Sequence, residues 1–273
     1  MNENRPGAPK WATQPFEDLI TDIEHLGQLL EMSVRGISVI QGMPQMVAAV
    51  AEAQGMSDHE ETRLELAEAE KRAAFAKREV ENGFPVLHGN TAIALWSHLE
   101  ATIRLFLARW LENDKSSLEI EPIQKMRVKI GEYERLQGED RYFFILDRLE
   151  HEMTAPLKCG INRFESILSL LGLCGEIHEK IQRDIFELNQ VRNCLMHRAG
   201  RADRRFAEAC PWLNLEAGQR IQVSPASVRR YFESVMHYAS EIICRVGERY
   251  GKDMSHSRKA IAESIPKDHL ARQ

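Results

Sequence analysis

The residues with the clearest chemical potential lie at positions 190–200, near the end of a strongly amphipathic run that begins around residue 175. Arg192, Asn193 and His197 form the pattern R-N-x-x-x-H there. Arginine carries a fixed charge on a planar fork that suits a phosphate group. Histidine has the side chain whose unperturbed pKa, about 6.5, allows proton abstraction and donation near neutral pH. With the hydrogen-bonding amide, these groups could cleave RNA without a metal ion.

The spacing of the three residues sets how they can meet. On an ideal helix Asn193 and His197 share a face, because they are four residues apart. Arg192 and His197 are displaced by about 140° and about 7.5 Å of rise. Either the long arginine side chain covers this offset, or the last helical turn before Gly200 is distorted.

These roles define a hypothesis for the reaction. His197 acts on the ribose 2′-hydroxyl or on the departing 5′-oxygen, Arg192 holds the scissile phosphate, and Asn193 orients the histidine or a phosphate oxygen. The products are a 2′,3′-cyclic phosphate and a 5′-hydroxyl. Because one histidine cannot easily be both base and acid in a single step, a homodimer with two copies of the site is the natural complement.

A group of arginines follows His197 within eight residues: Arg198, Arg201, Arg204 and Arg205. One interpretation is a rim that tracks the RNA backbone beside the site. The other is a solvated loop whose arginines pair with nearby acidic residues: Asp203, Glu208 and Glu216. Composition leaves both interpretations open.

Each motif residue also has a purely structural interpretation. His197 could cap a helix end, where the helix dipole favours a cation. Arg192 could form a salt bridge with Asp184 or Glu187 on the same helix, or with a residue of another helix. Cys194, inside the motif, is better explained by packing than by nucleophilic chemistry. No histidine pair has zinc-ligand spacing and no glycine-rich phosphate loop is present, so we expect neither a metal nor a cofactor.

Composition predicts a mostly helical protein. Of 273 residues, 43% are hydrophobic and 28% charged, with only 16 Gly and 10 Pro. The net charge of −5 argues against general coating of nucleic acid, so any RNA contact must be local. Five widely spaced cysteines are expected to be reduced and mostly packed. The first residues lack a signal pattern and no apolar run approaches about 20 residues, which favours the cytoplasm and no membrane partner.

Periodicity divides the N-terminal part into a polar lead-in over residues 1–14, a helix from Phe16 to about Met32, and a weaker stretch from Ile37 to Val50. Residues 57–60 match the S-x-x-E capping box. A charged helix to about Glu81 should follow, and its composition suits a solvated or coiled-coil-like arm.

Gly83 and Pro85 mark the best internal boundary, after which large apolar residues are denser. Helices are predicted over residues 93–110, 122–137, 140–153 and 164–171, then over the motif run, and finally from 225 to about 251. Glu100 and Arg104 have the spacing of a helical ion pair. Residues 218–223 are expected to be an extended segment or hairpin arm, and residues 252–273 a frayed tail.

Several of these features together resemble the HEPN superfamily over roughly residues 84–250. They are the R-N-x-x-x-H element at a helix end, a preceding core helix with Trp96, Leu99 and Glu100, the R-A-D stretch at 201–203, the G-x-x-I-x-V-S segment at 218–224, and a last helix with Tyr231 and Tyr238. The resemblance implies an all-α bundle of four or five core helices. It also implies a metal-independent endoribonuclease, commonly dimeric, with catalytic Arg192 and His197 and a supporting Asn193.

Members of this family often act as toxins or as effectors of antiviral and abortive-infection systems, so a regulatory or antitoxin partner is expected. One branch carries a tyrosine two residues after the histidine, which its partner modifies; Ala199 stands there in this chain. The resemblance leaves residues 1–82 as an additional helical extension, residues 83–251 as the HEPN-like domain and residues 252–273 as a tail. The alternative is a non-catalytic helical module that binds nucleotide, RNA or a protein, with residues 57–81 as a dimerisation or docking arm.

Overall fold

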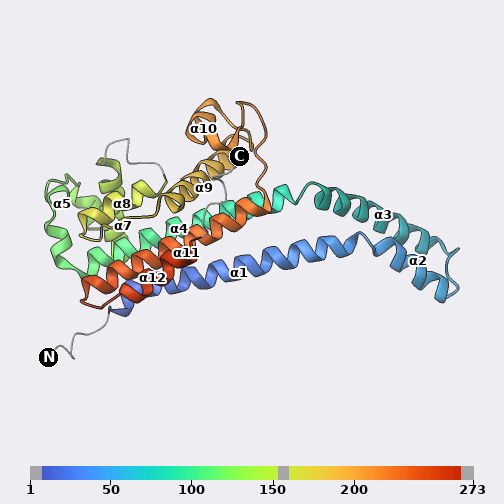
Figure 1. The fold of residues 1–273 in the computed structure, drawn as a ribbon, viewed down its shortest axis with the longest axis horizontal. Coiled ribbons are helices and arrows are strands. Elements are labelled where there is room, and N and C mark those ends of the chain that lie inside the picture. Colours follow the sequence, from blue (N-terminus) through green and yellow to red (C-terminus); the bar gives the residue numbers. More distant parts are fainter. Residues whose placement is uncertain (1–7, 153–159, 266–273) are drawn as a thin grey trace.

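The computed structural model describes residues 8–152 and 160–265, and the fold is all-α, as predicted (Figure 1). The long helices are α1 (Lys10–Ile40), α2 (Met43–Ala53), α3 (Glu60–Glu81), α4 (Pro85–Asn113), α7 (Glu139–Glu152), α8 (Ile161–Leu170), α9 (Glu179–His197), α11 (Pro225–Arg249) and α12 (Ser255–Ser264). Shorter elements are η1 (Lys115–Glu119), α5 (Glu121–Gln124), α6 (Ile130–Tyr133), α10 (Arg204–Ala209) and η3 (Pro211–Leu213).

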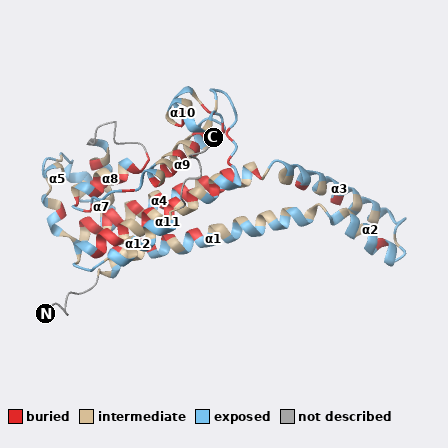
Figure 2. Cartoon of the chain, in the orientation of Figure 1, coloured by how far each residue is buried: buried red, intermediate tan, exposed pale blue. Residues whose placement is uncertain are grey.

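The core of the body lies around α4 and α11, which run side by side and are covered by α7, α8, α9 and the first half of α1 (Figures 1 and 2). The apolar stripe predicted on residues 93–110 faces this core. Phe106 packs against Phe16 of α1 with ring centroids 5.0 Å apart, and Trp96 stacks on Phe164 of α8 at 5.8 Å. Residues of α1 thus share one core with residues beyond the predicted boundary at Gly83.

An arm formed by the second half of α1, α2 and α3 projects from this body and is mostly exposed (Figures 1 and 2). Helix α3 ends at Glu81, as predicted, and contacts α1 and α2 through a narrow inner face centred on the buried Ala69 and Ala76. Phe84 adopts a left-handed conformation with φ 56°, and Pro85 then begins α4. The predicted helix break at this point is confirmed, while the division into domains stays a prediction.

Two expectations for the N-terminal part are wrong. Helix α1 begins at Lys10 and continues through Pro15, so residues 10–14 are not a flexible lead-in; residues 1–7 lie outside the described residues. The turn before Pro15 is helical because it packs on the body: Ala12 is buried, and the ring of Trp11 lies 5.5 Å from that of Trp110, measured between centroids. The predicted capping box does not form, because α3 begins one residue after His59, which makes no side-chain cap.

Two further expectations are corrected. Residues 122–137 form only the short helices α5 and α6 rather than one helix. Glu100 binds Arg163 instead of Arg104, which bridges Asp147 and Glu150 on α7.

Part of the expected tail is also helical: residues 255–264 form α12. Arg258 holds this helix on α11 through Glu241 and Glu248, with N–O distances of 2.6 Å to each. Residues 266–273 lie outside the described residues. Among the helices of the described ranges, none has the length and apolar character that a membrane span needs.

Candidate functional site

The R-N-x-x-x-H motif occupies the last turns of α9, where the sequence predicts it. One stripe of this helix is buried against the core: Ile181, Ile185, Leu188, Val191 and Cys194. The helix stays regular through His197, so its last turn is not distorted. It then ends in a left-handed turn at Ala199 and Gly200, φ 51° and 71°, closed by the Gly200 N–H donating to the Cys194 carbonyl at 3.0 Å.

Arg192 and Asn193 are brought into contact. The Arg192 Nη1 donates to the Asn193 Oδ1 at 3.1 Å, and the Asn193 Nδ2 donates to the Asn189 Oδ1 at 3.4 Å. The Arg192 Nε is buried and has no hydrogen-bond partner among the described residues. Because Nε is closed to solvent, a ligand would reach this guanidinium through its terminal nitrogens, of which Nη2 makes no hydrogen bond to the described residues.

The structural alternative for Arg192, an ion pair with Asp184 or Glu187, is wrong. Both carboxylates are completely buried and are bound by Arg230 of α11. The Arg230 Nη1 donates to Asp184 and its Nη2 donates to the Glu187 Oε1 at 2.9 Å. Within the described ranges, no carboxylate lies at ion-pair distance from Arg192.

His197 is exposed at the carboxyl end of α9, the end at which the helix dipole favours a cation. In the described part of the chain its ring makes no hydrogen bond, either to Arg192 or to Asn193. The site as it stands therefore consists of a contacting Arg192–Asn193 pair and a separate, solvent-accessible imidazole one turn further along the helix.

A buried polar cluster behind the motif was not anticipated from the sequence. Glu187 accepts hydrogen bonds from Arg230, from the Tyr231 hydroxyl at 2.7 Å and from the Trp212 indole at 2.5 Å. Asp184 accepts from Arg230 and, at 3.1 Å, from Ser234. Burial raises the pKa of Asp184, while the Arg230 charge opposes that rise.

This cluster fixes α9 against α11 and against the loop that follows α10, so it positions the motif. Asp184 and Glu187 are three residues apart on the apolar side of α9, among Ile181, Ile185 and Leu188. Two acidic residues inside an apolar stripe were the available signal for a buried network.

The four arginines beyond His197 lie around the turn that ends α9, and three of them have partners. Arg198 pairs with Asp203 at 3.5 Å and Arg204 with Glu208 at 2.8 Å, two of the acidic partners considered from the sequence. The Arg201 Nη1 donates to the Gly218 carbonyl at 2.9 Å.

Arg205 is exposed, and no carboxylate of the described residues is at ion-pair distance. Exposed pairs contribute at most about 1 kcal/mol, so a phosphate could displace the acidic partners. The contacts of these arginines agree with both interpretations given from the sequence, a rim that tracks the RNA backbone and a solvated loop of ion pairs.

The predicted extended segment at 218–223 is present and returns to the end of α9. Ala202 N–H donates to the Gln219 carbonyl at 2.9 Å, and Ile221 N–H donates to the Gly200 carbonyl at 2.8 Å. This pairing forms an antiparallel bridge between Arg201 and Arg220. Arg220 is thus a further basic residue beside the motif, and its place depends on a long-range pairing that the sequence pattern did not reveal.

The cysteine inside the motif packs rather than reacts. Cys194 is buried, and burial raises the pKa of its thiol, which disfavours the nucleophilic thiolate. Burial likewise raises the pKa of Cys210 to about 12. Cys159 lies outside the described residues. Among those residues, no group of three or more His, Cys, Asp and Glu side chains is arranged to hold a metal ion.

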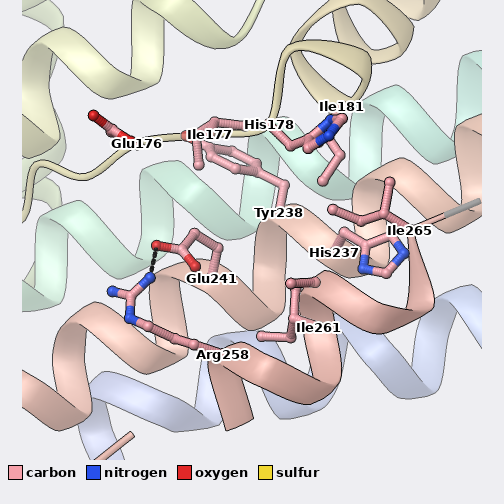
Figure 3. Close-up of a pocket in the computed structure, with 11 residues that line it drawn as sticks. Glu176, Ile177, His178, Ile181, His237, Tyr238, Glu241, Arg258, Ile261 and Ile265 are labelled. Atoms are coloured by element: carbon pink, nitrogen blue, oxygen red, sulfur yellow. Dashed lines mark hydrogen bonds and ion pairs between the residues drawn. The ribbon is translucent and has the colours of Figure 1, made fainter. Parts of the chain in front are cut away.

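In the described part of the chain, hollows away from the motif include two that border the body. One, of about 350 Å³, lies between the start of α9, α11 and α12, with His178 and His237 near one end and the Glu241–Arg258 pair at the other (Figure 3). Burial lowers the pKa of His237. The other, of about 440 Å³, is mainly apolar and lies between α1, His88 of α4 and the start of α11. Neither is lined by a motif residue.

Comparison with protein-family profiles, with curated proteins and with solved structures finds no match for this chain. The chemistry of the site therefore has to be argued from its own residues and from the resemblance of its motif. Two features carry that argument: the Arg192 guanidinium, which has no carboxylate partner within residues 8–152 and 160–265, and the accessible His197 on the same helix end.

Proposed function

We propose that this protein is a metal-independent endoribonuclease whose catalytic residues are Arg192, Asn193 and His197. The observation that carries the proposal is the state of Arg192. Its guanidinium is half-buried, bound only to the Asn193 amide, and lacks a carboxylate partner among the described residues although two buried carboxylates lie on the same helix. An arginine kept from neighbouring acids is available for a phosphate.

In the proposed reaction, the His197 imidazole removes the proton from a ribose 2′-hydroxyl. The 2′-oxygen attacks the adjacent phosphorus, the bond from phosphorus to the 5′-oxygen breaks, and the 5′-oxygen leaves with a proton. Arg192 binds the phosphate oxygens and stabilises the charge of the phosphorane, while Asn193 holds Arg192 in place. The products are a 2′,3′-cyclic phosphate and a 5′-hydroxyl.

A second imidazole completes this scheme. Because the proton for the 5′-oxygen must come from an acid, His197 of a second copy is the proposed donor, in a homodimer that places two motifs together. His197 is exposed and makes no hydrogen bond in the described residues, so it is accessible to such a neighbour. The basic rim of Arg198, Arg201, Arg204 and Arg205 is proposed to bind the flanking RNA phosphates.

The biological role is proposed from the resemblance to the HEPN superfamily alone. It is that of a growth-arresting toxin or an antiviral, abortive-infection effector in the cytoplasm, restrained by a regulatory or antitoxin partner. Ala199 stands where one branch has a modified tyrosine, so this position lacks the hydroxyl that the partner modifies in that branch.

The second candidate function is a non-catalytic helical module that binds a partner protein, RNA or nucleotide. The observation that favours it is the projecting arm, which carries exposed large hydrophobic side chains such as Met32, Leu64 and Phe75. The two candidate functions make different predictions: the ribonuclease cleaves RNA and needs Arg192 and His197 to do so, whereas the binding module does not cleave RNA.

The test is incubation of total RNA with the purified protein in the presence of a chelator, followed by analysis of fragment ends. Wild type is expected to cleave, and His197→Ala and Arg192→Ala are expected to lose at least about a hundredfold in rate. His256→Ala and Arg229→Ala are matched controls, because both residues are exposed and lie on α12 and α11. Equal cleavage by wild type and the motif variants would overturn the proposal.

A growth assay provides an independent readout. Expression of the wild type is expected to arrest growth, and expression of Arg192→Ala is not. Growth arrest by both proteins would show that the arrest does not depend on Arg192.

A further inference from the structure

The outer face of α3 carries large hydrophobic side chains that are exposed. Eight of the thirteen large hydrophobic side chains that are exposed in the described residues lie between residues 29 and 75, on the arm. Two of them, Leu64 and Phe75, are on α3 and are 66% and 55% exposed. They lie eleven residues apart, three helical turns, so they share one face of the helix. That face is turned by about 120° from the line of the buried Ala69 and Ala76, through which α3 contacts the rest of the arm.

Charged side chains complete the same stripe in a regular order. Spaced alternately by three and four residues, its members are Glu61, Leu64, Glu68, Lys71, Phe75 and Arg78, all of them exposed. Acidic residues occupy the first half of this stripe and basic residues the second. The Arg78 guanidinium lies over the Phe75 ring at 6.0 Å. The stripe thus reverses its charge on passing its centre, between Glu68 and Lys71.

We propose that this face binds a second copy of the same chain, with the two α3 helices antiparallel around a two-fold axis near that centre. In this register Leu64 of each copy packs against Phe75 of the other. Glu68 of each copy faces Lys71 of the other, and Glu61 faces Arg78. Every position of the stripe is thereby matched by a complementary one, which a two-fold interface requires of a single surface.

Charge also selects the direction of the helices. A parallel pair would place Glu68 against Glu68 and Lys71 against Lys71, and like charges at facing positions are destabilising. The antiparallel register does place Glu60 against Glu79, at the helix ends, where solvent screens the repulsion. Within one copy Glu68 pairs with Arg72 at 3.3 Å, but both side chains are more than half exposed, so this pair is easily exchanged.

The expected dimer is weak. Helix α3 has 22 residues, about 33 Å, and a single pair of helices of that length buries less surface than the roughly 1,200–2,000 Å² of stable interfaces. This association is independent of the proposed function. Because the arm projects away from the body, antiparallel arms place the two bodies at opposite ends, and the pairing of α9 motifs would use a different surface (Figure 1).

Sedimentation equilibrium of the full chain over a range of concentrations tests the proposal. Wild type is expected to self-associate through α3, from monomer to dimer, or from dimer to tetramer where the α9 motifs are already paired. Glu68→Lys and Lys71→Glu are each expected to raise the dissociation constant of this step by at least about tenfold, because each change creates two repulsive contacts per α3 pair. The double variant Glu68→Lys/Lys71→Glu is expected to return to within about threefold of wild type. Glu70→Lys and Lys77→Glu carry the same charge changes on exposed positions off the stripe, and are expected to have no effect.

Mixing the two single variants provides a second measurement. The Glu68→Lys copy has two lysines at the centre of its stripe and the Lys71→Glu copy has two glutamates, so they should bind each other more tightly than either binds itself. A wild type that stays monomeric at several hundred micromolar would overturn the proposal. So would a self-association that the two single variants leave unchanged, or one that the double variant fails to restore.

Discussion

Replacing Arg230 with methionine tests how α9 is held in place behind the motif. Arg230 of α11 pairs with two carboxylates, Asp184 and Glu187, that are both 0% exposed, and the Lys180 Nζ also lies 3.9 Å from Asp184. Removing one partner of a buried ion pair typically costs about 3–5 kcal/mol, because a buried charge is left without compensation. In Arg230→Met, Glu187 would lose its ion pair, while Asp184 would keep the one with Lys180. The Arg230 side chain itself is 30% exposed, so solvent reaches this cluster from one side. We therefore expect a loss near the lower limit, about 3 kcal/mol of unfolding free energy at pH 7.

The loss of unfolding free energy in Arg230→Met should depend on pH, and the titration of Asp184 sets the direction of that dependence. Burial raises the pKa of this carboxyl above its ordinary 3.8, and the Arg230 charge opposes the rise. Without Arg230 the pKa of Asp184 rises further, so the folded variant takes up a proton at a higher pH than its unfolded chain does. Acidification therefore favours the folded variant, and the deficit relative to wild type should narrow from pH 8 to pH 5.

Urea unfolding followed by tryptophan fluorescence measures this difference. Trp11, Trp96, Trp110 and Trp212 all belong to the body, so the signal does not depend on the arm. Arg229→Met is the matched control, because Arg229 is adjacent in sequence, 82% exposed and paired with Glu233. The control should lose less than about 1 kcal/mol. A loss below about 1 kcal/mol for Arg230→Met, or a deficit that does not narrow with acidification, would refute the reasoning.

Two other substitutions test the packing of the body. Gly175→Ala should lower the free energy of unfolding in urea by about 1–3 kcal/mol, because a Cβ there would lie 2.5 Å from the Nε of Arg245, a side chain that is 2% exposed. Gly36→Ala is the control: an added Cβ meets nothing within 4 Å, so the free energy of unfolding should stay the same or rise by up to about 1 kcal/mol. Equal effects of the two substitutions would contradict this reasoning. Burial lowers the pKa of His88 below 6.5, so on acidification the unfolded chain takes up a proton there before the folded chain does, which favours unfolding. His88→Leu removes this proton uptake, so the free energy of unfolding of the variant should fall less than that of wild type between about pH 7.5 and about pH 5.5. The same pH dependence in both proteins would contradict this prediction.

Periodicity predicted the helices that build the core, and local chemistry predicted some of their ends. Residues 93–110 and the motif run each bury the expected stripe. Helix α11 begins at Pro225, as expected, and the Ser224 hydroxyl caps it by accepting from the Ser227 N–H at 3.0 Å. These features depend on residues within one or two turns of each other, which a sequence displays directly.

The errors arise where long-range contacts decide the structure. Helix α12 is polar, and it forms against α11 because Arg258 reaches Glu241 and Glu248. Helix α1 starts before Pro15 because Trp11 packs on Trp110, almost a hundred residues away.

The same holds for the site. The sequence located Arg192, Asn193 and His197 at the end of one helix, but not which basic residue neutralises Asp184 and Glu187. That choice depends on how α11 docks on α9, and it decides that Arg192 has no carboxylate partner in the described residues.

The most direct test of the central claim uses two versions of one RNA oligonucleotide that the protein cleaves at a single position. In the second version the ribose at the cleaved linkage has hydrogen in place of its 2′-hydroxyl. If His197 activates that hydroxyl, only the unmodified version is cleaved, and its upstream fragment carries a 2′,3′-cyclic phosphate. Cleavage of both versions at the same rate would contradict the account.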